Sequence, residues 1–516
     1  MAITFTDTRG LVEQPVPFTD ALLTGLAPGG GLFIPTTLPH FSLAELCELA
    51  CLPYAQRAAR IYRAFEVDLD DATLDALCAD AYGKQWDDPR ITVTRPLADD
   101  TFVLELWHGP TSAFKDLALQ LTARSFSAAI AQEQAAGRLD RDALILVATS
   151  GDTGTAALNG FANRSHTNII VFYPAEGVSE IQRRQMVSQT GNNLAVFGVS
   201  GNFDDCQAAV KAAFGDAALA QWLGETAHLQ FSSANSINWG RLMPQIVYYL
   251  SAAAELADAG TISAAHPLDI AVPTGNFGNI LAAWYAKQMG APIGRLICAS
   301  NENKVLADFL ATGVYDIRNR VFTTTPTPSM DILISSNLER LLAEIAGPEA
   351  CAGWMQELYQ VHCFTVDPAT RARIQSEFTG GWLDNNETLA AIRRLYEEQH
   401  YLLDPHSAIA FEVGRRAKGV NPLLVVATAH WAKFAPNVVR ALTGTAYGEA
   451  LPERYAACSE FDLMRSVQEL APRAGHIPAH LAALASRPVR FTGMIAATTY
   501  AARAAIRTWV QDKNSL

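Results

Sequence analysis

Several features that would mark other classes of protein are missing from this chain of 516 residues. It has no uncharged apolar run long enough to cross a bilayer, so no membrane span is expected. No charged N-terminal stretch precedes an apolar segment, so no secretory leader is expected. Dense Lys/Arg blocks are absent and the net charge is -13, which argues against nucleic-acid binding.

Cysteine is sparse and unpatterned. The eight cysteines include no CxxC pair, and no histidine stands at zinc-binding spacing from them, so neither a metal site nor a disulfide framework is expected. Reduced, mostly buried thiols fit a cytoplasmic protein. The chain is 49% hydrophobic and 18% charged, and this composition with this length predicts two or three folded domains.

The sequence pattern changes near Arg95-Pro96. Before it, helical patterns cover residues 42–51 and 70–82. After it, strand, loop and helix alternate, which predicts mostly parallel sheets covered on both faces, with ligands at the carboxyl ends of the strands. The predicted strands are 101–106, 143–147, 168–173, 194–199, 268–272 and 423–427.

A lysine stands at the start of a predicted helix, 114–136, inside the segment from His108 to Asp116. The helix dipole disfavours a cation there, so another cause should hold Lys115 in place. Partial burial would give a neutral amine able to form an imine with an aldehyde cofactor. For a lysine considered alone, an ordinary helix-surface position is the better interpretation.

Two further segments have the composition of anion sites. Residues 148–156 place Ser150, Thr153 and glycines before a helix, whose free N–H groups attract an anion, here a carboxylate; an ordinary helix cap fits equally well. Residues 273–279 are Gly-rich and precede a helical pattern over 280–289, which suits a phosphate. Neither segment has Walker A or GxGxxG spacing.

Two more polar segments complete the set. Residues 232–241 combine hydroxyl and amide groups with Arg241, which suits a phosphate ester, although a polar loop with a helix cap is the favoured interpretation without context. Thr428 ends the last apolar strand, and alone it would be assigned to satisfying the backbone.

Together and in this order, the five segments resemble those of the threonine synthases. The resemblance extends over almost the whole chain. In its length and motifs, the chain resembles the longer branch of the family, which is found in fungi and many bacteria. Further matching stretches are Thr8–Gly10, Gly30–Pro35, Gln182–Met186, Gly201–Cys206 and Ser329–Ile332.

The resemblance implies an α/β fold of the pyridoxal-phosphate (PLP) fold type II. Mostly parallel sheets flanked by helices would form a large and a small domain beside a mainly helical N-terminal domain. The expected divisions are 1–95 for the N-terminal domain, 96–450 for the catalytic region with the small domain nested at about 140–235, and 451–516 for a helical extension packed on the large domain. A monomer is expected from the same branch resemblance.

The resemblance also implies roles for residues. Lys115 would bond covalently to the cofactor, and Thr428 would contact its pyridine nitrogen. The cofactor phosphate would be surrounded by Gly275, Asn276, Phe277, Gly278 and Asn279. The substrate carboxylate would lie near Ser150, Asp152 and Thr153, and the substrate phosphate near Ser236, Asn238 and Arg241. Trp431 departs from the family, where proline is expected.

The implied reaction converts O-phospho-L-homoserine and water into L-threonine and phosphate. Two alternatives stay open. One is another PLP enzyme of the same fold, either a threonine or serine dehydratase or a β-replacing synthase. The other is a non-catalytic relative that only binds PLP or phosphorylated ligands.

Overall fold

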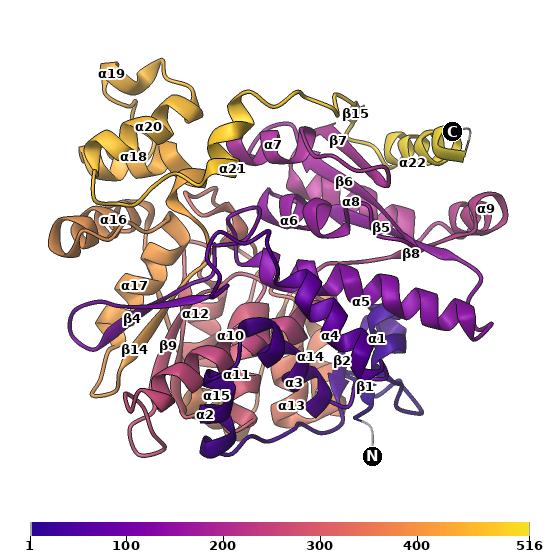
Figure 1. Ribbon diagram of the computed structural model, residues 1–516, viewed down its shortest axis with the longest axis horizontal. Helices are drawn as coiled ribbons and strands as arrows, with labels where there is room; N and C mark the ends of the chain where they lie inside the picture. The colour runs from indigo at the N-terminus through magenta and orange to yellow at the C-terminus, as the bar shows by residue number, and fades with distance from the viewer. Residues whose placement is uncertain (1–2, 515–516) are drawn as a thin grey trace.

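A six-stranded sheet forms the centre of the larger half of the molecule in the computed structural model, which describes residues 3–514 (Figure 1). Its strand order is β13-β10-β9-β14-β4-β3, and every neighbouring pair is parallel except β3 and β4. The strands are β3 (Val93–Pro96), β4 (Thr101–Glu105), β9 (Leu268–Pro273), β10 (Ile293–Ser300), β13 (Phe378–Trp382) and β14 (Leu423–Ala427).

Helices cover both faces of this sheet because its central strands are apolar on both sides. In β9, Ile270 and Val272 pack with the helices of one face, whereas Ala271 packs with those of the other. The first face is covered by α10 (Trp239–Asp258) and α11 (Gly278–Gln288). The second is covered by α16 (Asn385–Gln399), α17 (Pro405–Ala417) and α18 (Ala435–Thr443).

A second sheet of five parallel strands has the order β15-β7-β6-β5-β8 and lies at the top of Figure 1. Its strands are β5 (Asp142–Ala148), β6 (Thr167–Pro174), β7 (Leu194–Ser200), β8 (Leu229–Ser232) and β15 (Met494–Ala496). One face packs on α5 (Lys115–Ala135) and α6 (Asp152–Phe161), and the other on α8 (Phe203–Phe214) and α22 (Thr499–Asn514). Two further helices of this half are α7 (Glu180–Val187) and α9 (Ala217–Ala227).

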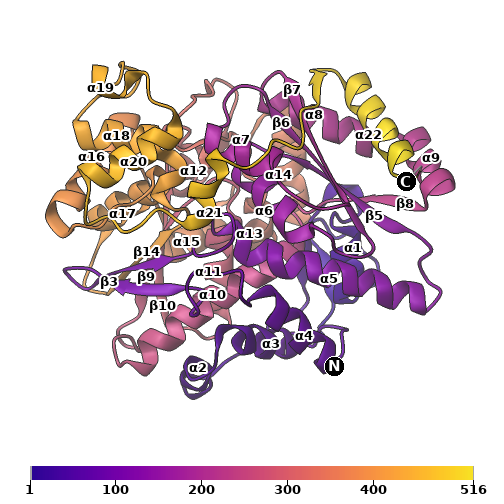
Figure 2. The same cartoon turned by 45° about the horizontal axis from the view of Figure 1, so that its top comes forward.

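The N-terminal segment packs as helices against α10 and α5, and most of it lies in the lower part of Figure 2. A small antiparallel pair, β1 (Phe5–Asp7) and β2 (Phe33–Pro35), fixes its start. Its helices are α1 (Phe18–Thr24), η1 (Pro28–Gly30), α2 (Leu43–Ala50), α3 (Tyr54–Ala64) and α4 (Asp71–Ala81). Ser42 and Asp70 cap α2 and α4, and each helix begins one residue after the start of its predicted pattern.

The remaining elements surround the large sheet. They are α12 (Val305–Thr312), β11 (Val314–Asp316), η2 (Pro328–Met330), α13 (Leu338–Ala346), α14 (Pro348–Val361), β12 (Cys363–Thr365), α15 (Pro368–Glu377), η3 (Trp431–Phe434), α19 (Glu453–Ala456), α20 (Glu460–Leu470), α21 (Ala479–Ala482) and η4 (Ala483–Ala485). The α/β class with mostly parallel sheets and an N-terminal helical region is confirmed. Within residues 3–514, no helix combines the length and apolarity needed to cross a membrane.

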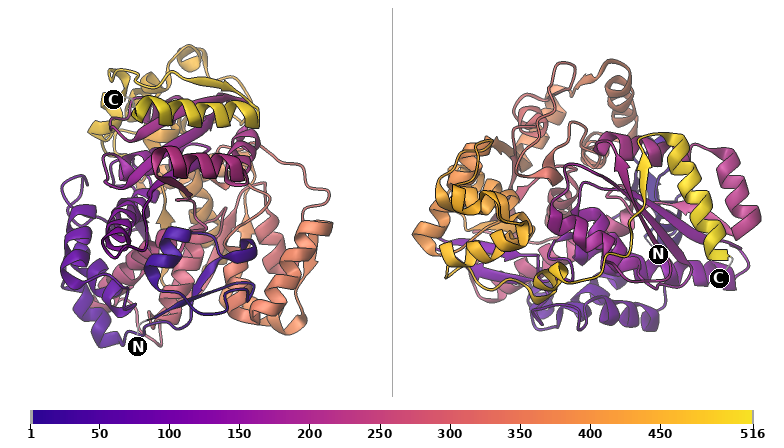
Figure 3. Two further views of the ribbon diagram at one scale, coloured as in Figure 1. Left: turned by 90° about the vertical axis from the view of Figure 1, so that its right-hand side faces the viewer. Right: turned by 90° about the horizontal axis from the view of Figure 1, so that it is seen from above.

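The C-terminal segment differs from the predicted helical extension on the large domain. Its first part, from α19 to η4, packs there: α20 lies on α18, and Tyr455, Leu481 and Leu484 join the same apolar cluster. The chain then crosses the molecule, β15 extends the five-stranded sheet beside β7, and α22 packs on α8 (Figure 3). Arg184 holds the crossing by donating hydrogen bonds to the carbonyl groups of Leu484, Ala485 and Arg487. β15 has three residues and gives no strand signal of its own.

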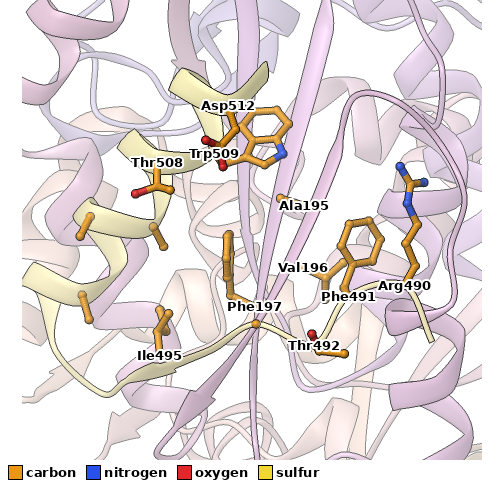
Figure 4. Close-up of a pocket in the computed structure, with 14 residues that line it drawn as sticks. Ala195, Val196, Phe197, Arg490, Phe491, Thr492, Ile495, Thr508, Trp509 and Asp512 are labelled. Carbon is orange, nitrogen blue, oxygen red and sulfur yellow. The ribbon is translucent and has the colours of Figure 1, made fainter. Parts of the chain in front are cut away.

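The C-terminal segment leaves a hollow of 580 Å³ against β7 (Figure 4). Its lining includes Phe197, Phe491 and Trp509, with Arg490 and Asp512 among the polar residues. None of the residues predicted to bind cofactor or substrate lines this hollow.

Candidate active site

The predicted lysine segment folds against the end of β14. The backbone N–H of Phe114 donates to the carbonyl of Thr428 over 2.8 Å, and the N–H of His430 donates to the carbonyl of Ser112 over 3.1 Å. Lys115 is the first residue of α5, as the sequence predicts. These bonds place Lys115 and Thr428 at the same edge of the large sheet, although the two residues are far apart in sequence.

Lys115 is buried, with 9% of its surface exposed. Desolvation lowers the pKa of its ammonium group from 10.5 to about 8, and the positive charges of Arg241 and Lys433 act in the same direction. The carboxylate of Asp152 opposes them. Its Nζ donates to Ser329 Oγ over 3.3 Å. With a pKa of about 8, roughly a tenth of this lysine is neutral amine at pH 7, far more than the ordinary pKa of 10.5 allows, and a residue that attacks an aldehyde needs that neutral form.

A charged histidine, His108, anchors the start of the lysine segment. Burial opposes protonation of His108, but hydrogen bonds to Asp87 (2.6 Å) and Glu105 (3.0 Å) raise its pKa to about 9. The next residue, Gly109, has no room for a side chain, because a Cβ there would lie 2.5 Å from the carboxylate of Asp116. That carboxylate accepts from both the N–H and the hydroxyl of Thr111, which closes the turn before Lys115.

Asp152 faces the lysine from the first turn of α6. Burial acts to raise its pKa, but the ammonium groups of Lys433 and Lys115 lower it well below its usual range. Lys433 Nζ lies 2.7 Å from Asp152 Oδ1, and Gln182 donates to the same oxygen over 2.8 Å. The neighbours Ser150 and Thr153 are only half-buried on the same turn.

The loop after β9 has the shape of a phosphate site. Phe277 adopts a left-handed conformation (φ 64°) and turns the chain into α11, whose first N–H groups lie at the loop. A Cβ on Gly275 would lie 2.9 Å from the carbonyl oxygen of Ser329. Asn276 is held by hydrogen bonds from the backbone and side chain of Asn337 to its carbonyl (3.0 and 3.1 Å).

Asn279 supplies an independent test of whether this loop suits an anion. Its Oδ1 accepts from the hydroxyls of Tyr248 and Tyr249, each over 2.6 Å. Its buried Nδ2 has no hydrogen-bond partner among the residues that the structure describes. A buried donor without a partner is costly, and a phosphate oxygen at the loop would satisfy it. The predicted phosphate site therefore fits the group.

The segment 232–241 lies beside this loop. A Cβ on Gly278 would come within 3.9 Å of the Ser236 side chain. Arg241 is buried, and desolvation lowers its pKa to about 10. Its Nη1 donates to the carbonyl of Ala234, and no carboxylate in residues 3–514 pairs with it. A buried guanidinium without a counter-charge is a site for an anionic ligand.

Asn238 belongs to the scaffold and not to the predicted phosphate-binding group. Its Nδ2 donates to the carbonyls of Leu22 and Ser233, and its Oδ1 accepts from the N–H of Gly240. The side chain is fully buried. Since its polar atoms already cap α10 and hold the N-terminal helices, the structure argues against a substrate contact for Asn238.

Thr428 ends β14, and its N–H donates to Ser407 Oγ over 2.9 Å. In the described part of the chain, its hydroxyl makes no hydrogen bond, which leaves it able to face a ligand. Trp431, the departure from the family, is buried and donates to the carbonyl of Ala474 over 3.2 Å. Trp431 thus ties the strand end to the C-terminal segment.

Sequence reasoning missed several residues around Lys115. Ser329 was noted only as part of a matching stretch, and Lys433 carries no pattern of its own. Asp404 and His406, at the start of α17, look like a helix cap. Across residues 3–514, no group of three or more His, Cys, Asp or Glu side chains is arranged to hold a metal ion.

Three family models match the chain in succession. They are threonine synthase N terminus over residues 4–82, pyridoxal-phosphate dependent enzyme over 93–376, and threonine synthase, C-terminal over 407–506. Human threonine synthase-like 1 is 41% identical in an alignment of 459 residues that covers 85% of this chain. The chain spans 61% of the length of that relative.

Two threonine synthases are similar over nearly their full length. The Pseudomonas aeruginosa enzyme is 38% identical over 88% of this chain and 92% of its own length. The crystal structure of PLP-bound threonine synthase from Brucella melitensis superposes with a TM-score of 0.84 at 36% identity, covering 99% of both chains.

Proposed function

The chain belongs to the threonine synthase family of PLP-dependent enzymes, and from this premise we propose that it converts O-phospho-L-homoserine and water into L-threonine and inorganic phosphate. The observation that carries the proposal is the environment of Lys115. A buried amine with a lowered pKa lies within the electrostatic influence of Arg241, a buried cation without a counter-charge. A substrate with an amino group and a phosphate suits both: its amine would react at the cofactor bonded to Lys115, and its phosphate would pair with Arg241.

The residues around Lys115 fit the family cofactor. Lys115 would bond to its aldehyde carbon, and the turn from Gly275 to Asn279 would hold its phosphate, where the Asn279 Nδ2 lacks a partner. The Thr428 hydroxyl would donate a hydrogen bond to the pyridine nitrogen without protonating it. When bound, PLP supplies a conjugated electron sink that makes the Cα and Cβ hydrogens of an amino-acid substrate acidic.

Lys115 is the group that moves protons in this proposal. When Lys115 is not bonded to the cofactor, its neutral ε-amine would take the proton from Cα of the substrate. A pKa of about 8 suits this role, because the amine is a competent base and its ammonium form a competent acid near neutral pH. Asp152 raises the pKa of Lys115, and its ion pair with Lys433 holds that carboxylate in place near the amine.

Arg241 and Ser236 would bind the substrate phosphate, and the turn of Ser150 and Thr153 would receive the substrate carboxylate. Asp152 would act there through Lys433 and Gln182, because a lone carboxylate would repel the ligand. Loss of a proton from Cβ would expel phosphate from Cγ, and Arg241 would assist by stabilising the departing charge. Cγ would then gain a proton, water would add at Cβ, and Lys115 would return a proton to Cα.

The wider setting is proposed on the same basis. We infer a cytoplasmic monomer with an N-terminal domain at 1–95 and a catalytic region at 96–450, in which a small domain is nested at about 140–235. Residues 451–516 would then link the two parts of the catalytic region. The buried and half-buried free cysteines support a reducing compartment.

Product analysis tests the proposal. Purified protein with PLP is incubated with O-phospho-L-homoserine, and phosphate and L-threonine are quantified, with Lys115→Ala as the control. Equal amounts of both products, lost in the control, are expected. Phosphate with a 2-oxo acid would identify an eliminating enzyme of the same fold. A PLP-loaded protein that forms no product would be a non-catalytic binder or act on another phosphorylated amino alcohol.

A further inference from the structure

Ser329 lies between the two parts of the site that would hold the cofactor. Its hydroxyl accepts a hydrogen bond from Lys115 Nζ over 3.3 Å. Its carbonyl oxygen is 2.9 Å from the position that a Cβ on Gly275 would occupy, so its backbone packs directly on the phosphate turn. Ser329 thus contacts the lysine on one side and the first glycine of the phosphate turn on the other.

A buried histidine and carboxylate fix the backbone of Ser329. The N–H of Ser329 donates to His406 Nε2 over 3.4 Å. His406 Nδ1 lies 2.8 Å from Asp404 Oδ1, and both side chains are buried. A proton on Nδ1 that faces the carboxylate leaves the lone pair of Nε2 for Ser329, which defines one neutral tautomer. The ring of Phe434 packs edge-on against the imidazole, with centroids 4.8 Å apart.

Asp404 also fixes the other end of the site. Its second oxygen accepts from the hydroxyl of Ser407, and that hydroxyl accepts from the N–H of Thr428 over 2.9 Å. One buried carboxylate therefore positions both Ser329 and Thr428. An ordinary helix cap would need only the backbone N–H groups that Asp404 also binds.

The chemical type of Ser329 suits an amine that must change its charge. The charged groups that act on Lys115 are Asp152 from α6, Arg241 from α10 and Lys433 from η3. A second carboxylate in the place of Ser329 would hold the lysine as an ammonium ion. A hydroxyl accepts a hydrogen bond from either form, so it orients the nitrogen at a much smaller cost to its basicity.

We propose that Ser329 is a further catalytic residue, which holds the ε-amino group of Lys115 whenever that amine is not bonded to the cofactor, and that His406 and Asp404 are positioning residues that act through it. The role in turnover rests on the proposed function. The role toward the cofactor does not, because a free Lys115 amine also exists in the protein before PLP is attached.

The test uses the full chain and two measurements. The first is the rate at which protein freed of PLP bonds covalently to added PLP, followed by absorbance; this step joins the amine to the aldehyde carbon and releases one water. The second is kcat and KM with O-phospho-L-homoserine. The variants are Ser329→Ala, Ser329→Thr and the neighbouring control Ser336→Ala, each first checked for thermal unfolding and for equilibrium PLP binding.

Ser329→Ala should slow covalent attachment and lower kcat, each on the order of tenfold, because the amine is no longer held in line with the carbon it attacks. KM should change by less than about threefold, since the substrate contacts remain. Ser329→Thr should restore both rates, and Ser336→Ala should behave as the wild type. If Ser329→Ala does not fold, a Thr variant with normal rates still supports the hydroxyl, and a folded Thr variant with the full defect refutes it.

His406→Gln tests whether the histidine acts through the serine. We expect it to lower both rates alone and to add nothing to Ser329→Ala, because the two changes remove the same interaction. Additive losses would overturn the positioning role of His406. Unchanged attachment and turnover in Ser329→Ala would overturn the proposal as a whole. Since attachment needs no substrate, a failure of the proposed substrate would leave this result readable.

Discussion

At the scale of single residues, the pKa of Lys115 makes a direct prediction. Only the neutral amine attacks PLP, so the rate of covalent attachment to the PLP-free protein should rise with pH through a midpoint near about 8 instead of the ordinary 10.5. Asp152→Asn removes the carboxylate that raises this pKa and should move the midpoint to lower pH. A wild-type midpoint near 10 would contradict the burial of this amine.

Arg241 is predicted to bind an anion at the expense of stability. Inorganic phosphate at millimolar concentration should raise the melting temperature of the PLP-loaded wild type, because it binds the folded state alone and the cofactor would already fill the phosphate turn at 275–279. Arg241→Met should abolish that phosphate effect, and without phosphate it should melt no lower than the wild type, since a buried charge without a partner is removed. Phosphate stabilisation that persists in the variant would place the anion site elsewhere.

At the scale of elements, the junction of β4 with the lysine segment should depend on pH. The pKa of His108 is raised to about 9, above an unfolded value near 6.5, so its stabilising contribution is complete below about pH 6.5 and is lost as pH rises through 9. The free energy of unfolding should fall across this window by at most about 3 kcal/mol. His108→Gln should remove this part of the pH dependence in denaturant titrations, and an unchanged slope would refute the assignment.

The phosphate turn should not tolerate a side chain at its first glycine. Gly275→Ala would bring a Cβ within 2.9 Å of the Ser329 carbonyl oxygen and 3.1 Å of the Met330 Cα, both backbone atoms, so the turn must shift. We expect PLP to be retained more weakly, as measured by equilibrium dialysis. Gly353→Ala is the matched control: it lies within α14 with nothing near its Cβ and should stabilise the protein by roughly 0.5–1 kcal/mol.

At the scale of the whole molecule, the C-terminal segment protects a sheet edge. Removing residues 490–516 would leave β7 as an exposed edge strand and uncover the face against which Ala502, Ile506 and Val510 are buried. The shortened protein should self-associate, because an unpaired edge strand beside an apolar face invites pairing between molecules. Light scattering after size-exclusion chromatography checks this. A monodisperse product of the same oligomeric state as the full chain would contradict it.

The sequence predicts well those strands and helices that have a clear apolar or helical pattern within their own residues. Continuous apolar runs gave six strands to within a residue or two, and the helix of Lys115 began one residue from its predicted start. The remaining strands of the two sheets, β3, β8, β10, β13 and β15, were missed. Two glycines interrupt β13, and β15 has only three residues. The contact between Ser329 and Lys115 spans 214 positions, and no local pattern encodes it. Asn238 looked like a ligand residue because sequence does not reveal which polar atoms the fold already uses.

The pairing of β4 with β14 also bears on how the protein is made. Lys433 donates a hydrogen bond to the carbonyl of Thr111, which lies 322 positions earlier in the sequence. The turn before Lys115 packs against the end of β14, a strand that is synthesised late. During synthesis, the Lys115 turn is complete long before its support exists. Competence to capture the cofactor should therefore arise abruptly, after residue 433 has left the exit tunnel. Nascent chains stalled before this length should not bind PLP. Binding of the cofactor would therefore indicate that synthesis has passed residue 433.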